Sequence, residues 1–415
     1  AIRRPVPGAG SAMAPSLAHR PAQQLRALGR DRRWLEALEL LGACLDCSYE
    51  PTGAVCSAAI SACEGCGKWQ EGQGLLRGLC RSQLELDVVA FSAAASACEK
   101  SRQWQVALFL LLEICTRCLQ LDTIVVSAGV SACEKCCEWR RALQLLGGHQ
   151  RCRLQPGVVA FNAAISACEK CREWEQALAL LAELCTSRLQ PSVVSYNAAA
   201  SACEKCHRWL QALRLLEELV SLRLQPGVIT YSAAISACEK GQQWAWGLAL
   251  MEDMRRAELQ PELITYNAAI SACENCQRWE WVLELLVSLR QEELRPDIVT
   301  YGAAISCSEK GHQWQLALAL MADLRRATLE PTVVTHCAAI SACARSGRWQ
   351  WALGLLAAAW VCGLDAATYN VALSACEAGR RCVLARTLQE EMQWRGVDLV
   401  SSELRGPSGE KRGKK

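Results

Sequence analysis

The residues best able to do chemistry in this chain of 415 residues are its 27 cysteines. Two Cys-x-x-Cys pairs separated by about 15 to 20 residues would be typical of a zinc site. Such pairs occur here at Cys44/Cys47, Cys63/Cys66, Cys115/Cys118, Cys133/Cys136, Cys168/Cys171, Cys203/Cys206 and Cys273/Cys276. Five of them share a 35-residue register, which would separate neighbouring pairs by one structural repeat. That spacing is too wide for Zn–S bonds of about 2.3 Å, so we predict reduced, mostly buried thiols that bind no metal.

No catalytic pattern accompanies the cysteines. The five histidines are never followed two positions later by Glu, as the zinc site of nucleobase deaminases requires. The sequence also contains no glycine-rich phosphate loop and no pair of carboxylates spaced for acid–base catalysis. We predict that the protein is not an enzyme and needs no cofactor.

Tryptophan marks a strict internal period. Ten tryptophans follow one another at intervals of 35 residues, namely Trp34, Trp69, Trp104, Trp139, Trp174, Trp209, Trp244, Trp279, Trp314 and Trp349. A cysteine column with the same spacing starts at Cys63, and a proline column runs from Pro156 to Pro331. A fixed period between about 20 and 50 residues is the signature of a solenoid or a propeller. The chain is therefore expected to be a tandem array of one structural unit.

Each copy of the unit contains two apolar stripes with helical spacing. In residues 158–192 these are Phe161, Ala164, Ile165 and Cys168, followed by Trp174, Ala177, Leu178, Leu181 and Leu184. A polar turn is expected between the stripes, around residues 169–173, and Pro191 prevents the second helix from continuing. The unit is thus predicted to be a helix-turn-helix pair. The whole chain is predicted to be an all-α, right-handed α-solenoid superhelix whose concave surface is lined by the first helices.

The period divides the chain into five segments. Nine clean repeats span residues 53–365, and degenerate repeats flank them at residues 18–52 and 366–400. Residues 1–17 and 401–415 are basic ends that we expect to be disordered. The first 30 residues contain Arg but no Asp or Glu, which is typical of an organelle transit peptide, although a plain basic tail has the same composition.

Composition argues against a membrane protein. The longest apolar stretch, residues 351–364, has 14 residues, whereas a membrane-spanning helix needs about 20. The formal net charge of +3 permits a nucleic-acid partner without indicating one. We expect a monomer that makes no contact with a membrane.

The repeat resembles the pentatricopeptide repeat of organellar RNA-binding proteins, in its P-type form, over residues 18–400. The resemblance rests on the 35-residue period, the opening Val193-Val194-Ser195-Tyr196-Asn197, an Ala-Leu second helix and the closing Leu294-Arg295-Pro296-Asp297. The related tetratricopeptide repeats have a period of about 34 residues and bind proteins. The resemblance implies sequence-selective binding of single-stranded RNA, one nucleotide per repeat, in organellar RNA processing, stability or translation. A chloroplast is preferred over a mitochondrion.

In that family, the residue after the aromatic of the first helix and the last residue of the repeat together contact one base edge. The resemblance assigns base reading here to Ser57, Asp87, Ser92, Asp122, Ser127, Asn162, Ser192, Asn197, Ser232, Asn267, Asp297 and Asn370. Asn267 with Asp297 matches the family's uracil pair, whereas about four of the nine repeats lack a readable pair. A purely structural role is the alternative, because Ser and Asn are favoured near helix N-termini.

Two further columns complete the site that the resemblance implies. Branched aliphatic residues three positions before the readers would pack on base faces, namely Val89, Ile124, Val159, Val194, Ile229, Ile264, Val299 and Val334. Lysines at the ends of the first helices would contact phosphates, namely Lys100, Lys135, Lys170, Lys205, Lys240 and Lys310. Each lysine follows a glutamate, so a solvated Glu-Lys turn is the alternative. For the whole chain, the alternative is a scaffold that binds a protein partner on the concave surface.

Overall fold

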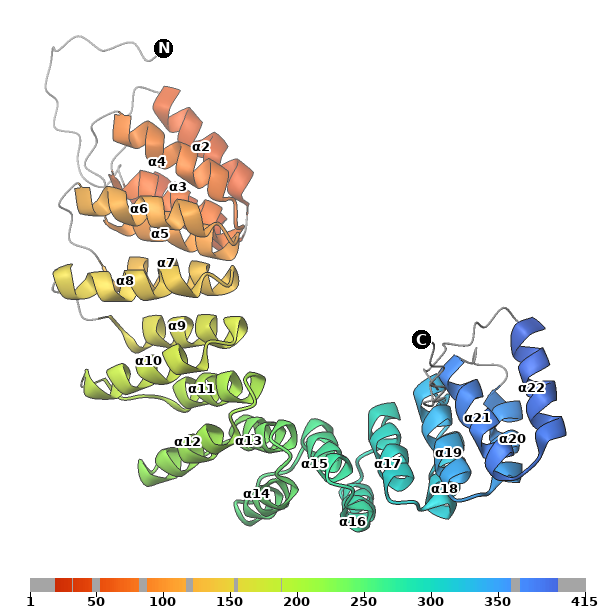
Figure 1. Cartoon of the computed structure of the whole chain (residues 1–415). Coiled ribbons are helices and arrows are strands. Elements are labelled where there is room, and N and C mark those ends of the chain that lie inside the picture. Colours follow the sequence, from red (N-terminus) through yellow and green to blue (C-terminus); the bar gives the residue numbers. More distant parts are fainter. Residues whose placement is uncertain are drawn as a thin grey trace, which may run out of the picture. The chain divides into compact units, whose positions relative to one another are not determined.

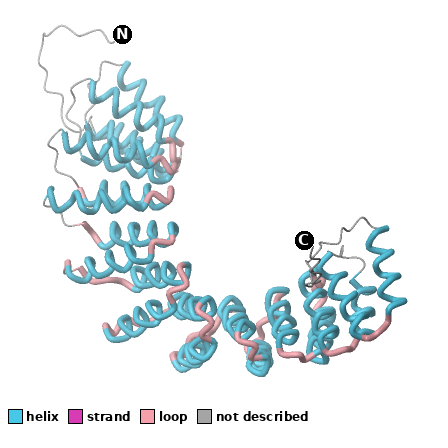
Figure 2. Tube along the Cα trace, in the orientation of Figure 1, coloured by secondary structure: helices cyan, strands magenta, loops and turns pink. Residues whose placement is uncertain are grey.

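The computed structural model describes residues 19–31, 33–46, 53–81, 88–116, 122–152, 156–187, 189–359 and 366–394. All regular secondary structure in these ranges is helical, as the sequence predicts. Figure 2 shows that short loops connect the helices. The basic ends expected at residues 1–17 and 401–415 lie outside the described residues.

The helices alternate between the first and the second helix of successive pairs. The first helices of the pairs are α1 (His19–Arg30), α3 (Gly53–Gly65), α5 (Val88–Lys100), α7 (Thr123–Lys135), α9 (Val158–Cys171), α11 (Val193–Lys205), α13 (Val228–Lys240), α15 (Leu263–Asn275), α17 (Ile298–Lys310), α19 (Val333–Arg345) and α21 (Ala366–Ala378). The second helices are α2 (Trp34–Asp46), α4 (Trp69–Arg81), α6 (Trp104–Thr116), α8 (Trp139–Cys152), α10 (Trp174–Thr186), α12 (Trp209–Ser221), α14 (Trp244–Arg256), α16 (Trp279–Gln291), α18 (Trp314–Arg326), α20 (Trp349–Ala358) and α22 (Cys382–Trp394). Each tryptophan of the period is therefore the first residue of a second helix.

The turn inside each pair is tighter than the sequence suggested. In the unit at residues 158–192, α9 continues to Cys171, so Glu169 and Lys170 are helical. After α13, Gln242 N–H donates to the Glu239 carbonyl at 3.0 Å and Gln243 N–H donates to the Cys238 carbonyl at 2.9 Å. These two bonds form the Schellman arrangement that ends many helices. It needs a left-handed residue, and Gln242 has φ of 55°.

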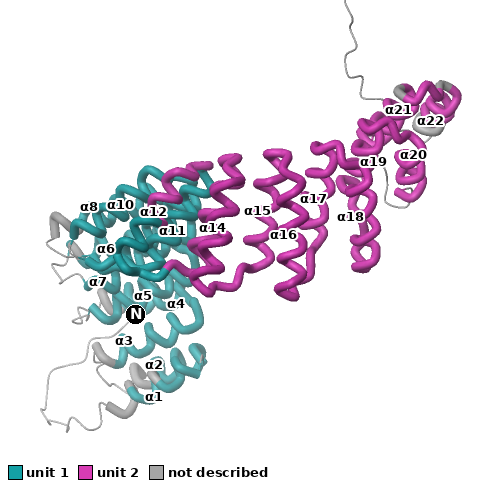
Figure 3. Tube along the Cα trace, turned by 90° about the horizontal axis from the view of Figure 1, so that it is seen from below, with its two compact units in different colours: residues 1–206, 217–225 teal, residues 207–216, 226–415 magenta. Residues whose placement is uncertain are grey.

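The chain forms two compact units, one comprising residues 1–206 and 217–225 and the other residues 207–216 and 226–415 (Figure 3). In the first unit, α1, α3, α5, α7, α9 and α11 pack one against the next, and in the second unit α13, α15, α17, α19 and α21 do the same. Helix α14 packs against the first helix of its own pair, α13, and against the next first helix, α15. Figure 1 shows this succession of helix pairs along each unit. Each unit is thus a stack of helix pairs, which is the solenoid architecture expected from the period.

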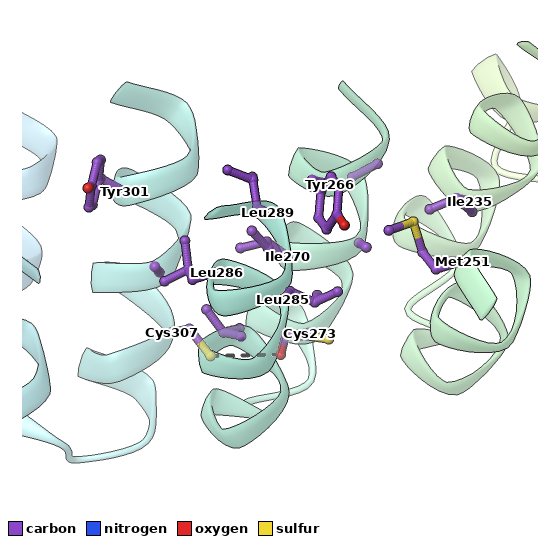
Figure 4. Packing of buried hydrophobic residues seen from close by; sticks show 14 of the residues in the cluster. Ile235, Met251, Tyr266, Ile270, Cys273, Leu285, Leu286, Leu289, Tyr301 and Cys307 are labelled. Carbon is purple, nitrogen blue, oxygen red and sulfur yellow. Dashed lines mark hydrogen bonds between the residues drawn. The ribbon is translucent and has the colours of Figure 1, made fainter. Parts of the chain in front are cut away.

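The core lies between the two helix layers (Figure 4). In α15, Tyr266, Ile270 and Cys273 are fully buried, and in α16 Leu286 and Leu289 pack in the same cluster. Small alanines on the first helices let the layers approach closely, while the larger side chains fill the space between pairs. Because the pairs repeat this arrangement, buried clusters follow one another along the stack, such as the clusters at residues 213–342 and 340–385 of the second unit.

The two cysteines of a Cys-x-x-Cys pair have different surroundings. The first, such as Cys168, is buried, and burial raises the pKa of its thiol to about 12, with a smaller contribution from neighbouring Cys171. The second contacts the preceding turn: Cys136 Sγ donates to the Arg102 carbonyl at 3.0 Å, and Cys206 Sγ donates to the Arg172 carbonyl at 3.0 Å. Among the described residues, no group of three or more His, Cys, Asp or Glu side chains is arranged to hold a metal ion.

Glycine stands in place of the second cysteine at Gly241 and Gly311. A Cβ atom built on Gly311 would lie 2.7 Å from Cδ1 of Trp279, and Gly241 stands in the same relation to Trp209. Each of these glycines therefore packs closely against a tryptophan ring of the preceding repeat. No helix in the described part of the chain is both long and apolar enough to cross a membrane.

Candidate nucleic-acid interface

The second residue of eight first helices, from α5 to α19, is an exposed aliphatic side chain. The exposed fractions are 59% for Val89, 57% for Ile124, 67% for Val159, 61% for Val194, 65% for Ile229, 68% for Ile264, 59% for Val299 and 70% for Val334. These are the eight residues predicted to pack on bases. The third residue of the same helices is buried, for example Thr300 at 0%. The exposure therefore belongs to one face of the helices, and it recurs once per repeat in each unit.

The fifth residue of each first helix, the predicted base reader, lies about one turn after the aliphatic side chain on the same helix face. Ser92, Ser127, Asn162, Asn197, Ser232, Asn267 and Asn370 are half-buried there. Ser57 differs from them because it is only 6% exposed. Most predicted readers thus sit at the edge of the surface.

The pair predicted to recognise uracil forms a hydrogen-bonded network. Asn267 Nδ2 donates to Asp297 Oδ1 at 3.3 Å and contacts Oδ2 at 3.5 Å. The Thr300 hydroxyl donates to Asn267 Oδ1 at 2.6 Å. Since a carboxylate only accepts hydrogen bonds, Asp297 requires the amide nitrogen to face it and so sets the orientation of the amide.

Asp297 also caps the following helix. Its carboxylate accepts from Thr300 N–H at 2.8 Å, and its own backbone N–H donates to Thr300 Oγ1 at 3.2 Å, which makes a capping box at the start of α17. Partial burial raises the pKa of this carboxyl, but hydrogen bonds from Thr300 and Asn267 outweigh that effect and hold the pKa below its usual value. The carboxylate is therefore ionised at neutral pH.

The repeat at residues 158–192 has the same arrangement with neutral groups. The Ser195 hydroxyl donates to Asn162 Oδ1 at 2.6 Å, and Asn162 Nδ2 contacts Ser192 Oγ at 3.5 Å. Ser192 and Ser195 form a capping box at the start of α11. In the other unit, Ser232 Oγ and Thr265 Oγ1 lie 2.7 Å apart. In these three places the structure joins a predicted reader to the next first helix.

Two predicted serine readers have different partners. Ser92 Oγ donates to the Val89 carbonyl at 2.9 Å and Ser127 Oγ donates to the Ile124 carbonyl at 2.8 Å, so each bonds its own helix. Asp122, the predicted partner of Ser92, caps α7 by accepting from Ile124 N–H at 3.4 Å. Asp87, the predicted partner of Ser57, lies outside the described residues.

The predicted phosphate lysines form ion pairs between successive repeats. The Nζ–Oε1 distances are 3.1 Å for Lys100 with Glu64, 2.9 Å for Lys135 with Glu99, 3.0 Å for Lys170 with Glu134, 2.9 Å for Lys205 with Glu169 and 3.0 Å for Lys310 with Glu274. Each lysine thus contacts the glutamate of the preceding repeat and not the one beside it in sequence. The lysine side chains are 36–48% exposed, so these pairs remain accessible to solvent and to anions.

The hydroxyl at the third position of the first helix is the feature that the sequence interpretation missed. Ser195, Thr230, Thr265, Thr300, Thr335 and Thr368 are all buried polar residues at this position. Val55, Ala90, Val125 and Ala160 occupy it in the earlier repeats. A buried hydroxyl repeated within an apolar stripe was the available signal, because a buried polar group requires a hydrogen-bonding partner.

Comparison with known proteins agrees with this architecture. The model of the pentatricopeptide repeat domain matches residues 144–205, 214–276, 249–309 and 284–346, and the model of the single PPR repeat matches residues 194–224. No curated protein matches the chain.

Three solved structures are similar to this chain. The maize pentatricopeptide repeat protein PPR10 is 16% identical, with 92% of this chain and 74% of that chain covered and a TM-score of 0.34. Its complex with an 18-nt psaJ RNA element is 17% identical, with coverage of 93% and 67% and a TM-score of 0.38. Yeast Rmd9p in complex with a 16nt target RNA is 10% identical, with coverage of 92% and 87% and a TM-score of 0.35. The family matches and the helix pairs repeated every 35 residues identify the chain as a pentatricopeptide repeat protein.

Proposed function

We propose that this protein binds single-stranded RNA in a sequence-selective manner along the face formed by its first helices. The observation that carries the proposal is the network of Asn267, Asp297 and Thr300. One N–H of the Asn267 amide goes to Asp297, and its oxygen accepts one hydrogen bond from Thr300. The other N–H and one lone pair stay available, which is a donor and an acceptor side by side. A pyrimidine edge such as that of uracil offers the complementary groups.

The neighbouring columns supply the other contacts that an RNA strand needs. The exposed aliphatic side chain one turn before each reader, such as Ile264, can pack against the flat face of a base. The lysines can exchange their glutamate partner for a phosphate at small cost, because an exposed ion pair is worth at most about 1 kcal/mol. The proposal thus assigns one base edge, one base face and one phosphate to each complete repeat.

For the biological role, we propose occlusion of a transcript segment in RNA processing, stability or translation in an organelle, with the chloroplast preferred. A protein bound along a single strand blocks exonucleases there and favours the unpaired state of the RNA by mass action. The assignment to an organelle rests on the first 30 residues, which contain Arg but no Asp or Glu. Residues 1–18 of this segment lie outside the described part of the structure. Import of a reporter fused to this segment into isolated chloroplasts and mitochondria tests that assignment.

Direct binding measurements test the main proposal. Purified protein should bind a random pool of single-stranded RNA more tightly than duplex RNA of the same length, and its affinity should fall as salt is raised. Equal binding to single strands and duplex, or binding without salt dependence, would contradict the proposal.

A protein-binding scaffold is the second candidate, and the Glu-Lys pairs favour it. Five lysines of the first-helix face are matched by glutamates, so these columns add little net charge. A peptide of mixed charge could exchange partners with both members of each pair. Under this candidate, charge reversal of Glu169 and Lys205 together should preserve partner binding far better than either reversal alone, and RNA should bind weakly to the unaltered protein.

A further inference from the structure

The buried hydroxyl at the third position of the first helix contacts both the start of its own helix and the reader of the preceding repeat. At the start of α17, Thr300 Oγ1 accepts from the backbone N–H of Asp297 at 3.2 Å, and at the start of α11 Ser195 Oγ accepts from the backbone N–H of Ser192 at 3.2 Å. Each hydroxyl has a single proton to donate, and at Thr300 two acceptors lie near it, Asn267 Oδ1 at 2.6 Å and Asp297 Oδ1 at 2.8 Å. In both cases the shortest contact of the hydroxyl is an amide oxygen in the preceding repeat, at 2.6 Å.

This contact favours one orientation of the asparagine amide, and at Asn267 it adds to the effect of Asp297. A hydroxyl that donates requires the amide oxygen to face it, so the NH2 group of Asn162 or Asn267 must lie on the other side. Rotating either amide by half a turn would replace the bond to the amide oxygen by a bond from the NH2 group to the remaining lone pair of the hydroxyl, and at Asn267 it would also turn the amide oxygen toward the Asp297 carboxylate. In Asn162 this constraint matters most, because Ser192 Oγ is a 3.5 Å contact and, unlike a carboxylate, can donate as well as accept.

Repeats without the hydroxyl show the contrast. The readers Ser92 and Ser127 are followed, one repeat later, by the apolar third-position residues Val125 and Ala160. Each of these serines donates to a carbonyl of its own helix instead, at 2.9 Å and 2.8 Å. Their protons are therefore used inside the helix, whereas the readers that precede a hydroxyl are joined to the next repeat.

We propose that the third-position hydroxyl is a positioning residue that fixes the orientation of the base-reading side chain in the preceding repeat and so decides which repeats discriminate between bases. The inference rests on the proposed RNA-binding function. It assigns strong discrimination to Asn162 and Asn267, which face Ser195 and Thr300, and weak discrimination to Ser92 and Ser127. The hydroxyl itself touches no base, because it is buried beneath the reader.

The matched test compares Thr300→Val with Thr335→Val. Valine keeps the shape of threonine, and Val125 already occupies the equivalent buried position in α7. Thr335 is equally buried at the start of α19, but the preceding reader position holds Gly302, which has no side chain to orient. Both variants therefore remove one buried hydroxyl, and only Thr300→Val removes the contact to a base reader.

The measurement is enrichment from a random pool of single-stranded RNA, carried out for the unaltered protein and each variant. For Thr300→Val, we expect the base preference at one nucleotide position to fall about fivefold, the equivalent of one neutral hydrogen bond. Preferences at the other positions should not change. Thr335→Val and the conservative Thr300→Ser should retain the original motif. The reciprocal variant Val125→Thr should sharpen the preference at the nucleotide that faces Ser92.

Each outcome decides between distinct explanations. An unchanged motif in Thr300→Val, or an equal loss at all positions in both valine variants, would overturn the inference while RNA binding itself stands. Failure of the unaltered protein to enrich any RNA would refute the proposed function before any variant is compared. The side-chain amide NMR signal of Asn267 in RNA-free protein provides a separate check: it should shift in Thr300→Val and stay in place in Thr335→Val.

Discussion

At the scale of single residues, Asp297 performs two tasks. It caps α17 and it holds the amide of Asn267. A substitution of Asp297 would therefore change helix stability and base recognition together, since loss of an N-cap costs about 1 kcal/mol. Asn267 is the better residue for testing recognition alone, because its side chain lies at the surface of α15 and carries no charge.

We predict that Asn267→Thr changes the preferred base at one position of the bound RNA. In the family that the repeat resembles, Thr with Asp goes with guanine, so the preference should move from uracil toward guanine. The loss of affinity for the original RNA should be about 1 kcal/mol, the net contribution of one neutral hydrogen bond. Enrichment from a random RNA pool measures the shift. An unchanged motif at every position would show that the assigned register is wrong.

His336 makes the stability of α19 depend on pH. It occupies the position that tyrosine holds in neighbouring repeats, and it is 1% exposed. Burial, followed by the nearby charge of Arg325, lowers its pKa below the ordinary 6.5, against a hydrogen bond to the Thr332 carbonyl that raises it. The unfolded chain therefore binds the proton more readily than the folded one. The contribution of His336 to the free energy of unfolding should be fully present above pH 6.5. It should be lost as the pH falls through the lower pKa that His336 has in the folded chain.

Urea unfolding at pH 7.5 and pH 5.5 measures this effect, with His336→Tyr for comparison. Tyrosine is the residue at the same position in α15 and α17, where Tyr266 and Tyr301 contact Arg255 and Arg290. The variant should lose less stability than the unaltered protein between the two pH values. Equal losses would mean that His336 is protonated as easily in the folded chain as in the unfolded one.

At the scale of the helix pair, the turn imposes one left-handed residue per repeat. Among the described turns between paired helices, two have glycine at the left-handed position, namely Gly67 and Gly347. The other turns have residues such as Gln242 and Gln277 there. A side chain in this conformation costs about 1 kcal/mol or more, because its Cβ approaches the carbonyl oxygen. The turns therefore store strain that the packing of the two helices must offset.

We predict that Gln242→Gly raises the unfolding free energy by up to about 1 kcal/mol, since glycine adopts a positive φ without the steric penalty. Gly347→Ala is the reverse experiment. Gly347 has φ of 69°, and a Cβ atom at this position would meet no atom within 4 Å. The loss of stability on substitution would therefore come from the backbone conformation alone. The two substitutions should shift the thermal unfolding midpoint in opposite directions. Shifts of the same sign would show that the turn conformation is not the cause.

At the scale of the whole molecule, the repeated lysines determine how binding should respond to salt. Each phosphate neutralised on a single strand contributes about 0.7 to the slope of log affinity against log salt concentration. Lys310→Ala should therefore reduce that slope by about 0.7 and weaken all RNA sequences alike. Arg256→Ala is the control, because Arg256 is a 70% exposed cation on α14, a second helix. Equal effects of the two substitutions would place the phosphates elsewhere.

The amino-acid sequence by itself determined the repeating unit, the helix pairs and the start of each second helix at tryptophan, because apolar spacing and proline position act within one repeat. The family resemblance also joined Asn267 to Asp297, 30 residues away, which the structure places in contact.

Only the tertiary structure decided which residues meet across repeats. It paired five of the predicted phosphate lysines with glutamates 36 residues earlier, placed Thr300 against Asn267 and turned Ser92 and Ser127 onto their own helices. These contacts depend on the rise and rotation from one helix pair to the next, which are set by the packing of buried side chains. A sequence period states that neighbours are alike but contains no information on how far one is displaced from the other. That displacement selects the partners that polar side chains on the proposed RNA-binding face find in the neighbouring repeat.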